Sequence, residues 1–171
     1  MTLAGHRTVW QSGGMWIRCL PVLLLLCAPP ATAAEFNGPA RVVDPGTIEI
    51  GGTAIRLFGL TAPSADQICV RGGTPWRCGQ EAGWALAERL ERHWALCDVR
   101  TTDPSGRSAA VCYLGGRNGI DVNAWMIEHG WALAHAEAPD YAALERTARQ
   151  AGIGLWSGKL GAPPDLIPSR K

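Results

Sequence analysis

Two arginines have the residue type and setting needed to hold a phosphate or another anion. Arg56 lies in the segment 55–60, which reads as a strand with one buried arginine, and Arg107 ends the tight turn 103–107. Two guanidinium groups brought together bind one phosphate through pairs of parallel hydrogen bonds. The turn after Arg56 lacks a carboxylate that would hold a metal ion beside that phosphate. The sequence therefore favours anion binding over metal-assisted hydrolysis.

Both arginines also have structural interpretations. Arg56 could pair with Glu49 or Glu81 as part of the framework, and Arg107 could simply be solvated after its turn. Two positive groups without neutralising carboxylates repel each other. We therefore expect the pair to favour an anion between them.

The first 34 residues are predicted to be a secretory signal peptide. Arg18 precedes the apolar run 19–28, and the small residues 31–34 follow it. The apolar run is too short to serve as a transmembrane helix. Met15 could be the true start, and Cys27 leaves a lipoprotein alternative open. We expect an exported protein, periplasmic or extracellular, with no membrane span in its mature form.

The chain after residue 34 is close to neutral. Residues 1–34 hold two arginines and no acidic residue, so the mature chain has 14 basic and 15 acidic side chains, a net charge of −1. Strong nucleic-acid binding by charge alone needs clustered Lys and Arg. We therefore expect only weak binding of nucleic acid or another anionic ligand, and no protein partner is indicated. The length fits one domain, residues 35–160, with a proline-containing tail at 161–171.

Four cysteines remain after residue 34, which in an exported chain predicts two disulfides. The sequence Asp-Pro-Ser-Gly at 103–106 suits a type I turn, and a hairpin centred there places Cys97 opposite Cys112. Cys69 and Cys78 then close the loop between them. We expect no metal site, because no Cys-x-x-Cys pair exists and the histidines lack ligand spacing.

The order of elements predicts an α+β protein that is mainly β, with a five-stranded Greek-key OB-fold barrel flanked by three helices. We expect strands at 40–43, 47–50, 53–60, 94–100 and 107–114, a short extended piece at 131–135, and helices at 78–93, 121–130 and 139–152. Five tryptophans fall on apolar faces and are expected in the core: Trp84, Trp94, Trp125, Trp131 and Trp156. Base stacking would instead need these rings exposed.

Seven short motifs, taken in their order along the chain, resemble those of the staphylococcal nuclease (thermonuclease) family. Members of this family are calcium-dependent phosphodiesterases with an OB-fold. The resemblance covers roughly residues 41–158. The motifs are RVVDPGTIE at 41–49, IRLFGLTAP at 55–63, CGQEA at 78–82, DPSGR at 103–107, DVNAWM at 121–126, GWALA at 130–134 and GLW at 154–156.

The resemblance implies that Arg56 and Arg107 are the family's two phosphate-gripping catalytic arginines. The family's acidic residues do not carry over. Its calcium motif Asp-Gly-Asp-Thr has Gly46 at the second aspartate, and its second metal aspartate and catalytic glutamate become Thr61 and Ser64. Without the ion, such a site loses its Lewis acid and its means of activating water.

Other positions of the family pocket are changed as well. Ser105 replaces the aromatic beside the second arginine, and His135 replaces a later tyrosine that borders the nucleotide pocket. Ser64 has no histidine close in sequence that would make it a nucleophile. Asp44 or Asp66 could supply a substitute carboxylate.

These observations predict an exported thermonuclease-fold protein that has lost calcium-dependent phosphodiester hydrolysis. We expect a non-catalytic homologue that needs no cofactor and keeps an arginine-lined pocket for phosphate or another anion. Two alternatives remain. One is an active secreted nuclease that hydrolyses DNA or RNA with unmapped carboxylates. The other is a structural or interaction module of the cell envelope.

Overall fold

A computed structural model of the protein describes residues 34–91 and 93–158. Except for Ala34, the predicted signal peptide lies outside the described residues, as does the predicted tail 161–171. No helix of the described part is long and apolar enough to cross a membrane.

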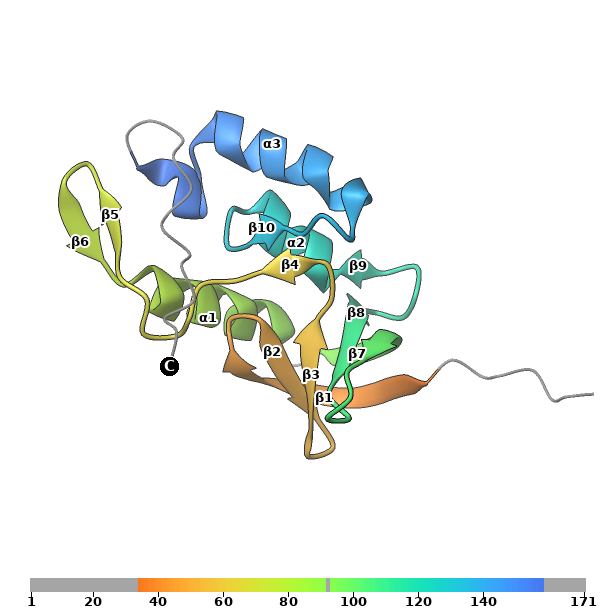
Figure 1. Cartoon of the computed structure of the whole chain (residues 1–171). Helices are drawn as coiled ribbons and strands as arrows, with labels where there is room; N and C mark the ends of the chain where they lie inside the picture. The colour runs from red at the N-terminus through yellow and green to blue at the C-terminus, as the bar shows by residue number, and fades with distance from the viewer. Residues whose placement is uncertain (1–33, 92, 159–171) are drawn as a thin grey trace, which may run out of the picture. The chain divides into compact units, whose positions relative to one another are not determined.

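Five strands form the closed OB-fold barrel predicted from the sequence (Figure 1). Neighbouring strands pair antiparallel in the order β3–β2–β1–β7–β8, and a parallel pairing between β3 and β8 closes the barrel. The bounds are β1 Glu35–Asp44, β2 Thr47–Ile50, β3 Thr53–Leu57, β7 Trp94–Thr102 and β8 Ser108–Leu114. Closure leaves no free edge on β3 or β8, and it fixes which residues of these two strands are neighbours. A short strand, β9 (Ile120–Asp121), adds to β8.

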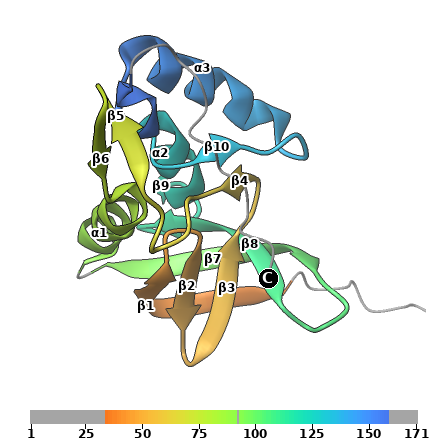
Figure 2. The same ribbon diagram turned by 60° about the vertical axis from the view of Figure 1, so that its left-hand side comes forward.

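Three helices flank the barrel, as predicted: α1 (Cys78–Leu90), α2 (Val122–Glu128) and α3 (Ala142–Ala151). Helix α2 contacts both β8 and α3, so it lies between the barrel and α3 (Figure 2). Asp121 caps α2, because its carboxylate accepts a hydrogen bond from the Ala124 N–H at 2.9 Å. Gly152 ends α3 in the left-handed conformation, at φ 63°. Pro139 opens a 3₁₀ turn, η1 (Pro139–Tyr141), and α3 follows it.

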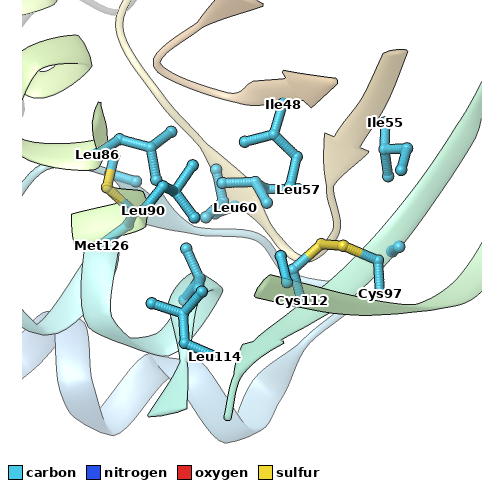
Figure 3. Close-up of a cluster of buried hydrophobic side chains, with 14 of the residues drawn as sticks. Ile48, Ile55, Leu57, Leu60, Leu86, Leu90, Cys97, Cys112, Leu114 and Met126 are labelled. Carbon is cyan, nitrogen blue, oxygen red and sulfur yellow. A yellow bond between two sulfur atoms is a disulfide. The ribbon is translucent and has the colours of Figure 1, made fainter. Parts of the chain in front are cut away.

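The hydrophobic core fills the barrel and continues beneath α1 and α2 (Figure 3). Leu86 and Leu90 of α1 and Met126 of α2 point toward the strands, and each of these side chains is almost completely buried. The disulfide Cys97–Cys112 lies in this core and joins directly opposed residues of β7 and β8. The predicted hairpin register is therefore the observed one.

The second disulfide, Cys69–Cys78, closes a small hairpin at a place where the sequence predicts only a loop. Its strands are β5 (Cys69–Arg71) and β6 (Thr74–Trp76). The Arg71 guanidinium carbon lies 3.9 Å from the centroid of the Trp76 ring. Arg71 Nε also donates to Ser157 Oγ at 2.6 Å, which ties the hairpin to the 3₁₀ turn η2 (Gly154–Ser157).

The prediction of a tryptophan core is only partly right. Trp156 is buried, with 2% of its surface exposed, and Trp125 and Trp131 are half-buried against the core. Trp84 and Trp94 are 63% and 66% exposed, so the prediction is wrong for both. The inward stripe of α1 is already supplied by smaller side chains, and Trp94 starts β7 on the side opposite the buried Ala95.

One buried polar side chain, Asn123 of α2, forms hydrogen bonds near the β3–β8 pairing that closes the barrel. Its Oδ1 accepts from the Cys112 N–H at 3.1 Å, while Nδ2 donates to the carbonyls of Phe58 at 2.8 Å and Ala110 at 3.0 Å. Phe58 follows β3, and the other two residues belong to β8. The amide therefore satisfies backbone groups on β8 and on the residue that directly follows β3.

Replacing this amide should destabilise the fold. Asn123→Leu has a similar volume but leaves one buried N–H and two carbonyls without that partner, so we expect the free energy of unfolding to fall by about 3 kcal/mol. Urea denaturation followed by circular dichroism measures the change. The control Asn118→Ala, at an exposed position, should change it by less than about 0.5 kcal/mol. Equal stability of the two variants would contradict this role of Asn123.

Candidate anion-binding site

An open cavity of about 410 Å³ lies beside the end of β3 and the short strand β4 (Leu60–Thr61). We call it the Arg56 cavity. Its lining combines one arginine, one carboxylate and several hydroxyls with apolar side chains. The lining residues are Asp44, Gly46, Thr47, Arg56, Leu57, Leu60, Thr61, Ala62, Pro63, Ser64 and Ala65.

Arg56 reaches this cavity because β3 alternates between the core and the outer surface. Ile55 and Leu57 are buried in the core, so the intervening Arg56 points outward and is exposed. The expectation of a buried arginine is therefore wrong. Glu49 does not pair with it either, since Glu49 accepts from Arg41 at 2.7 Å. Within the described residues, the Arg56 guanidinium has no hydrogen bond or ion pair with another side chain.

Arg56 lies on β3, whereas Arg107 lies in the turn before the neighbouring strand β8, and the two side chains have different surroundings. Arg107 directly precedes Ser108, which pairs with Ile55 in the parallel ladder. Arg107 does not line the Arg56 cavity. Its Nε donates to Asp103 Oδ2 at 2.8 Å, so a carboxylate lies against this guanidinium. The expected repulsion between two unneutralised arginines is thus reduced at Arg107, while Arg56 keeps its charge unpaired within the described part.

Asp103 organises the turn that presents Arg107. Its Oδ1 accepts from the Ser105 hydroxyl at 2.6 Å and from the Arg107 backbone N–H at 3.0 Å. These hydrogen bonds, followed by the one from the Arg107 guanidinium, hold the pKa of Asp103 well below its ordinary value. The residue is thus ionised at neutral pH and fixes the turn through several acceptors at once.

The donor set of the cavity does not fit calcium. Thr61 and Ser64 contribute neutral hydroxyls and Gly46 only backbone, whereas calcium takes six to eight oxygens with several carboxylates among them. The one carboxylate in the lining belongs to Asp44, and its Oδ1 already accepts from the Gly46 N–H at 2.8 Å. Asp66 is exposed and outside the lining. No group of three or more His, Cys, Asp or Glu side chains forms a metal-binding cluster in residues 34–91 and 93–158.

The two changed pocket residues, Ser105 and His135, do not line the Arg56 cavity. Ser105 is exposed at the tip of the 103–107 turn, where it bonds to Asp103. His135 follows β10 (Leu133–Ala134), which pairs with β4, and its N–H donates to the Gly59 carbonyl at 2.9 Å. Its exposed imidazole Nδ1 lies 3.9 Å from Glu137 Oε2.

The closed five-stranded barrel with three flanking helices defines an α+β protein of the OB-fold class. A family model described as staphylococcal nuclease homologue matches residues 54–158. The chain therefore belongs to the staphylococcal nuclease homologue family. The match includes both arginines, Thr61 and Ser64, and begins after the Asp44–Thr47 motif.

Two relatives extend this comparison. The chain is similar to the succinoglycan biosynthesis protein ExoI of Rhizobium meliloti (strain 1021), with 36% identity over 137 residues, 77% of this chain and 71% of the relative. It is also similar to protein ParB of Escherichia coli, with 28% identity over 156 residues, 82% of this chain and 83% of the relative.

The ion pair of Asp103 with Arg107 was not predicted from the sequence. The turn motif indicates Asp103 as the first residue of a turn, although an aspartate four residues before Arg107 is also a natural ion-pair partner. The signal was present in the turn motif itself, because an aspartate at its first position commonly accepts hydrogen bonds from the following backbone N–H groups.

Asp103 should make stability depend on pH. Because its folded-state pKa lies below the unfolded value, its contribution is fully present above the unfolded pKa and is lost as the pH falls through the folded pKa. Between pH 5 and pH 2 the wild type should therefore lose more stability than Asp103→Asn. Thermal unfolding at both pH values measures this, with Asp66→Asn as the exposed control. Equal losses in the wild type and Asp103→Asn would contradict the assignment.

Proposed function

We propose that this protein is a non-catalytic member of its family that binds a phosphate or another anionic group in the Arg56 cavity. The observation that carries the proposal is the exposed guanidinium of Arg56, which has no ion-pair partner within residues 34–91 and 93–158. It lies in a cavity whose family carboxylates are replaced by Gly46, Thr61 and Ser64. An arginine lacking an acidic partner presents its whole fork of donors to a ligand. The neighbouring hydroxyls of Thr61 and Ser64 would add neutral hydrogen bonds to the anion.

The proposal assigns Arg107 a supporting role. Arg107 precedes the strand segment that pairs with β3. The Asp103 carboxylate accepts a hydrogen bond from Nε of the Arg107 guanidinium. Its remaining N–H groups could reach an anion that enters beside Arg56. The proposed site uses no calcium, because the donors around it do not match that ion.

We also propose that the protein acts outside the cytoplasm, in the periplasm or the extracellular space. The two disulfides support this location, since such bonds persist in oxidising compartments. The predicted signal peptide at residues 1–34 supports it independently. The ExoI relative is named for succinoglycan biosynthesis and not for nuclease activity, which is compatible with a ligand other than a nucleic acid.

A second candidate function is weak nuclease activity. Asp44 favours it, because this carboxylate lines the same cavity as Arg56. A single carboxylate that already bonds to the Gly46 N–H is a poor general base and a poor metal ligand. A purely structural envelope module would leave the exposed Arg56 without a role.

Anion binding is tested by thermal unfolding in phosphate. We expect phosphate at ten times its Kd to stabilise the wild type by about 1.4 kcal/mol relative to chloride at equal ionic strength. Arg56→Ala should lose this stabilisation, whereas Arg100→Ala, an exposed arginine outside the cavity, should keep it. The same stabilisation in all three proteins would reduce the effect to a general salt effect. No stabilisation of the wild type would refute the anion site.

Restoring the family carboxylates should create calcium-dependent cleavage. The nearest atoms to a Cβ added at Gly46 are Ala62 Cβ at 3.5 Å and Asp44 Oδ1 at 3.6 Å, so an aspartate side chain can start there without a clash. We expect Gly46→Asp/Thr61→Asp/Ser64→Glu to cleave DNA with calcium but not with chelator, at least 100-fold faster than the wild type.

The wild type and a Gly46→Ala/Thr61→Ser/Ser64→Thr variant are the controls for this gain of activity. Calcium-dependent cleavage by the wild type that disappears in Arg107→Ala would replace our proposal with the nuclease candidate. No gain in the triple variant, with its fold intact, would mean that the cavity lacks more than carboxylates.

A further inference from the structure

A second cavity, of about 420 Å³, lies between α1 and α2 and shares no lining residue with the Arg56 cavity. We call it the tryptophan cavity. It is lined by two indole rings and by side chains of α1 and the residues after it. The lining residues are Ala85, Glu88, Arg89, His93, Trp125 and Trp131.

Arg89 is the unusual member of this lining. Its Nε is fully buried and has no hydrogen-bond partner among the described residues. No carboxylate of the described part forms an ion pair with it, although Glu88 lines the same cavity. A buried donor without an acceptor costs stability, and a charged donor costs more, so such groups in folded proteins call for an explanation.

The rings beside Arg89 are held in fixed positions. The Arg89 guanidinium carbon lies 5.3 Å from the centroid of the Trp125 ring, within the range of a cation–π contact. Trp125 also stacks on His129, with ring centroids 4.5 Å apart and planes at 29°. Trp131 is half-buried and forms a second apolar wall. The cavity thus offers a flat apolar surface next to an arginine whose Nε has no acceptor in the described part of the chain.

The charges around the cavity restrict the ligand further. A carboxylate matches the planar guanidinium better than any other small anion except phosphate. The exposed carboxylate of Glu88 adds a negative charge at the rim, which disfavours a ligand with two or more negative charges, such as a phosphate monoester. The apolar walls favour a ligand with a flat, apolar body.

We propose that the tryptophan cavity binds a small aromatic monocarboxylate. The carboxylate accepts hydrogen bonds from Arg89, and the aromatic body packs against Trp131 and the edge of Trp125. This site is independent of the proposed anion-binding function, since the two cavities use different residues and different ligand chemistry. The volume of the cavity accommodates a ligand with one or two aromatic rings.

Isothermal titration calorimetry of the oxidised protein with benzoate, phenylacetate and indole-3-acetate tests the site. We expect saturable binding of at least one acid with a Kd of about 1 mM or tighter. The neutral amide of that acid should bind at least tenfold more weakly, because it lacks the charge that Arg89 recognises. The indole N–H signals of Trp125 and Trp131 in NMR spectra should shift with the same Kd.

Two variants and a matched control complete the experiment. Arg89→Gln should weaken binding at least tenfold, as should Trp131→Leu, while Arg100→Gln, an exposed arginine outside the cavity, should leave it unchanged. Circular dichroism verifies that each variant is folded. No saturable binding of any of the three acids, or equal binding of acid and amide, overturns the proposal even if Arg89→Gln does not fold.

Discussion

The parallel ladder between β3 and β8 is the constraint on which the rest of the structure depends. It joins two strands that are far apart in the sequence and converts an open sheet into a barrel. The Asn123 amide reinforces the ladder by bonding to the backbone of β8 and of Phe58, which directly follows β3. The same ladder places Arg56 opposite Ala109, so it sets how the strand that carries Arg56 lies beside the strand that Arg107 precedes.

The chemistry of the Arg56 cavity is separable from the stability of the fold. Gly46, Thr61 and Ser64 lie outside the hydrophobic core, so their replacement of family carboxylates removes metal ligands without removing core packing. It also removes like charges that would repel one another in the absence of an ion. A barrel of this family can therefore lose the groups for hydrolysis while it keeps an arginine that recognises an anion.

The hairpins of the barrel could be predicted from local signals, because turn residues set which consecutive strands pair. The Cys97–Cys112 register followed from the turn at residues 103–106 in this way. The exposure of Arg56 could not be predicted from the sequence. The alternation of side chains along a strand shows that neighbouring residues face opposite sides, but it does not show which side faces the core. Trp84 was misplaced because apolar character does not decide which side chains fill a helix face. The tryptophan cavity depends on how α1 packs near α2, which no local motif encodes.

The disulfide between β7 and β8 has a consequence for how the chain acquires its structure. It keeps two opposed residues of one hairpin together even when everything around them is unfolded, so this pairing need not be searched for again. Docking of β3 onto β8 has no such tether, and contacts between distant segments form slowly. In the oxidised protein, the pairings of β1 with β7 and of β3 with β8 should accordingly form later in refolding than the β7–β8 hairpin.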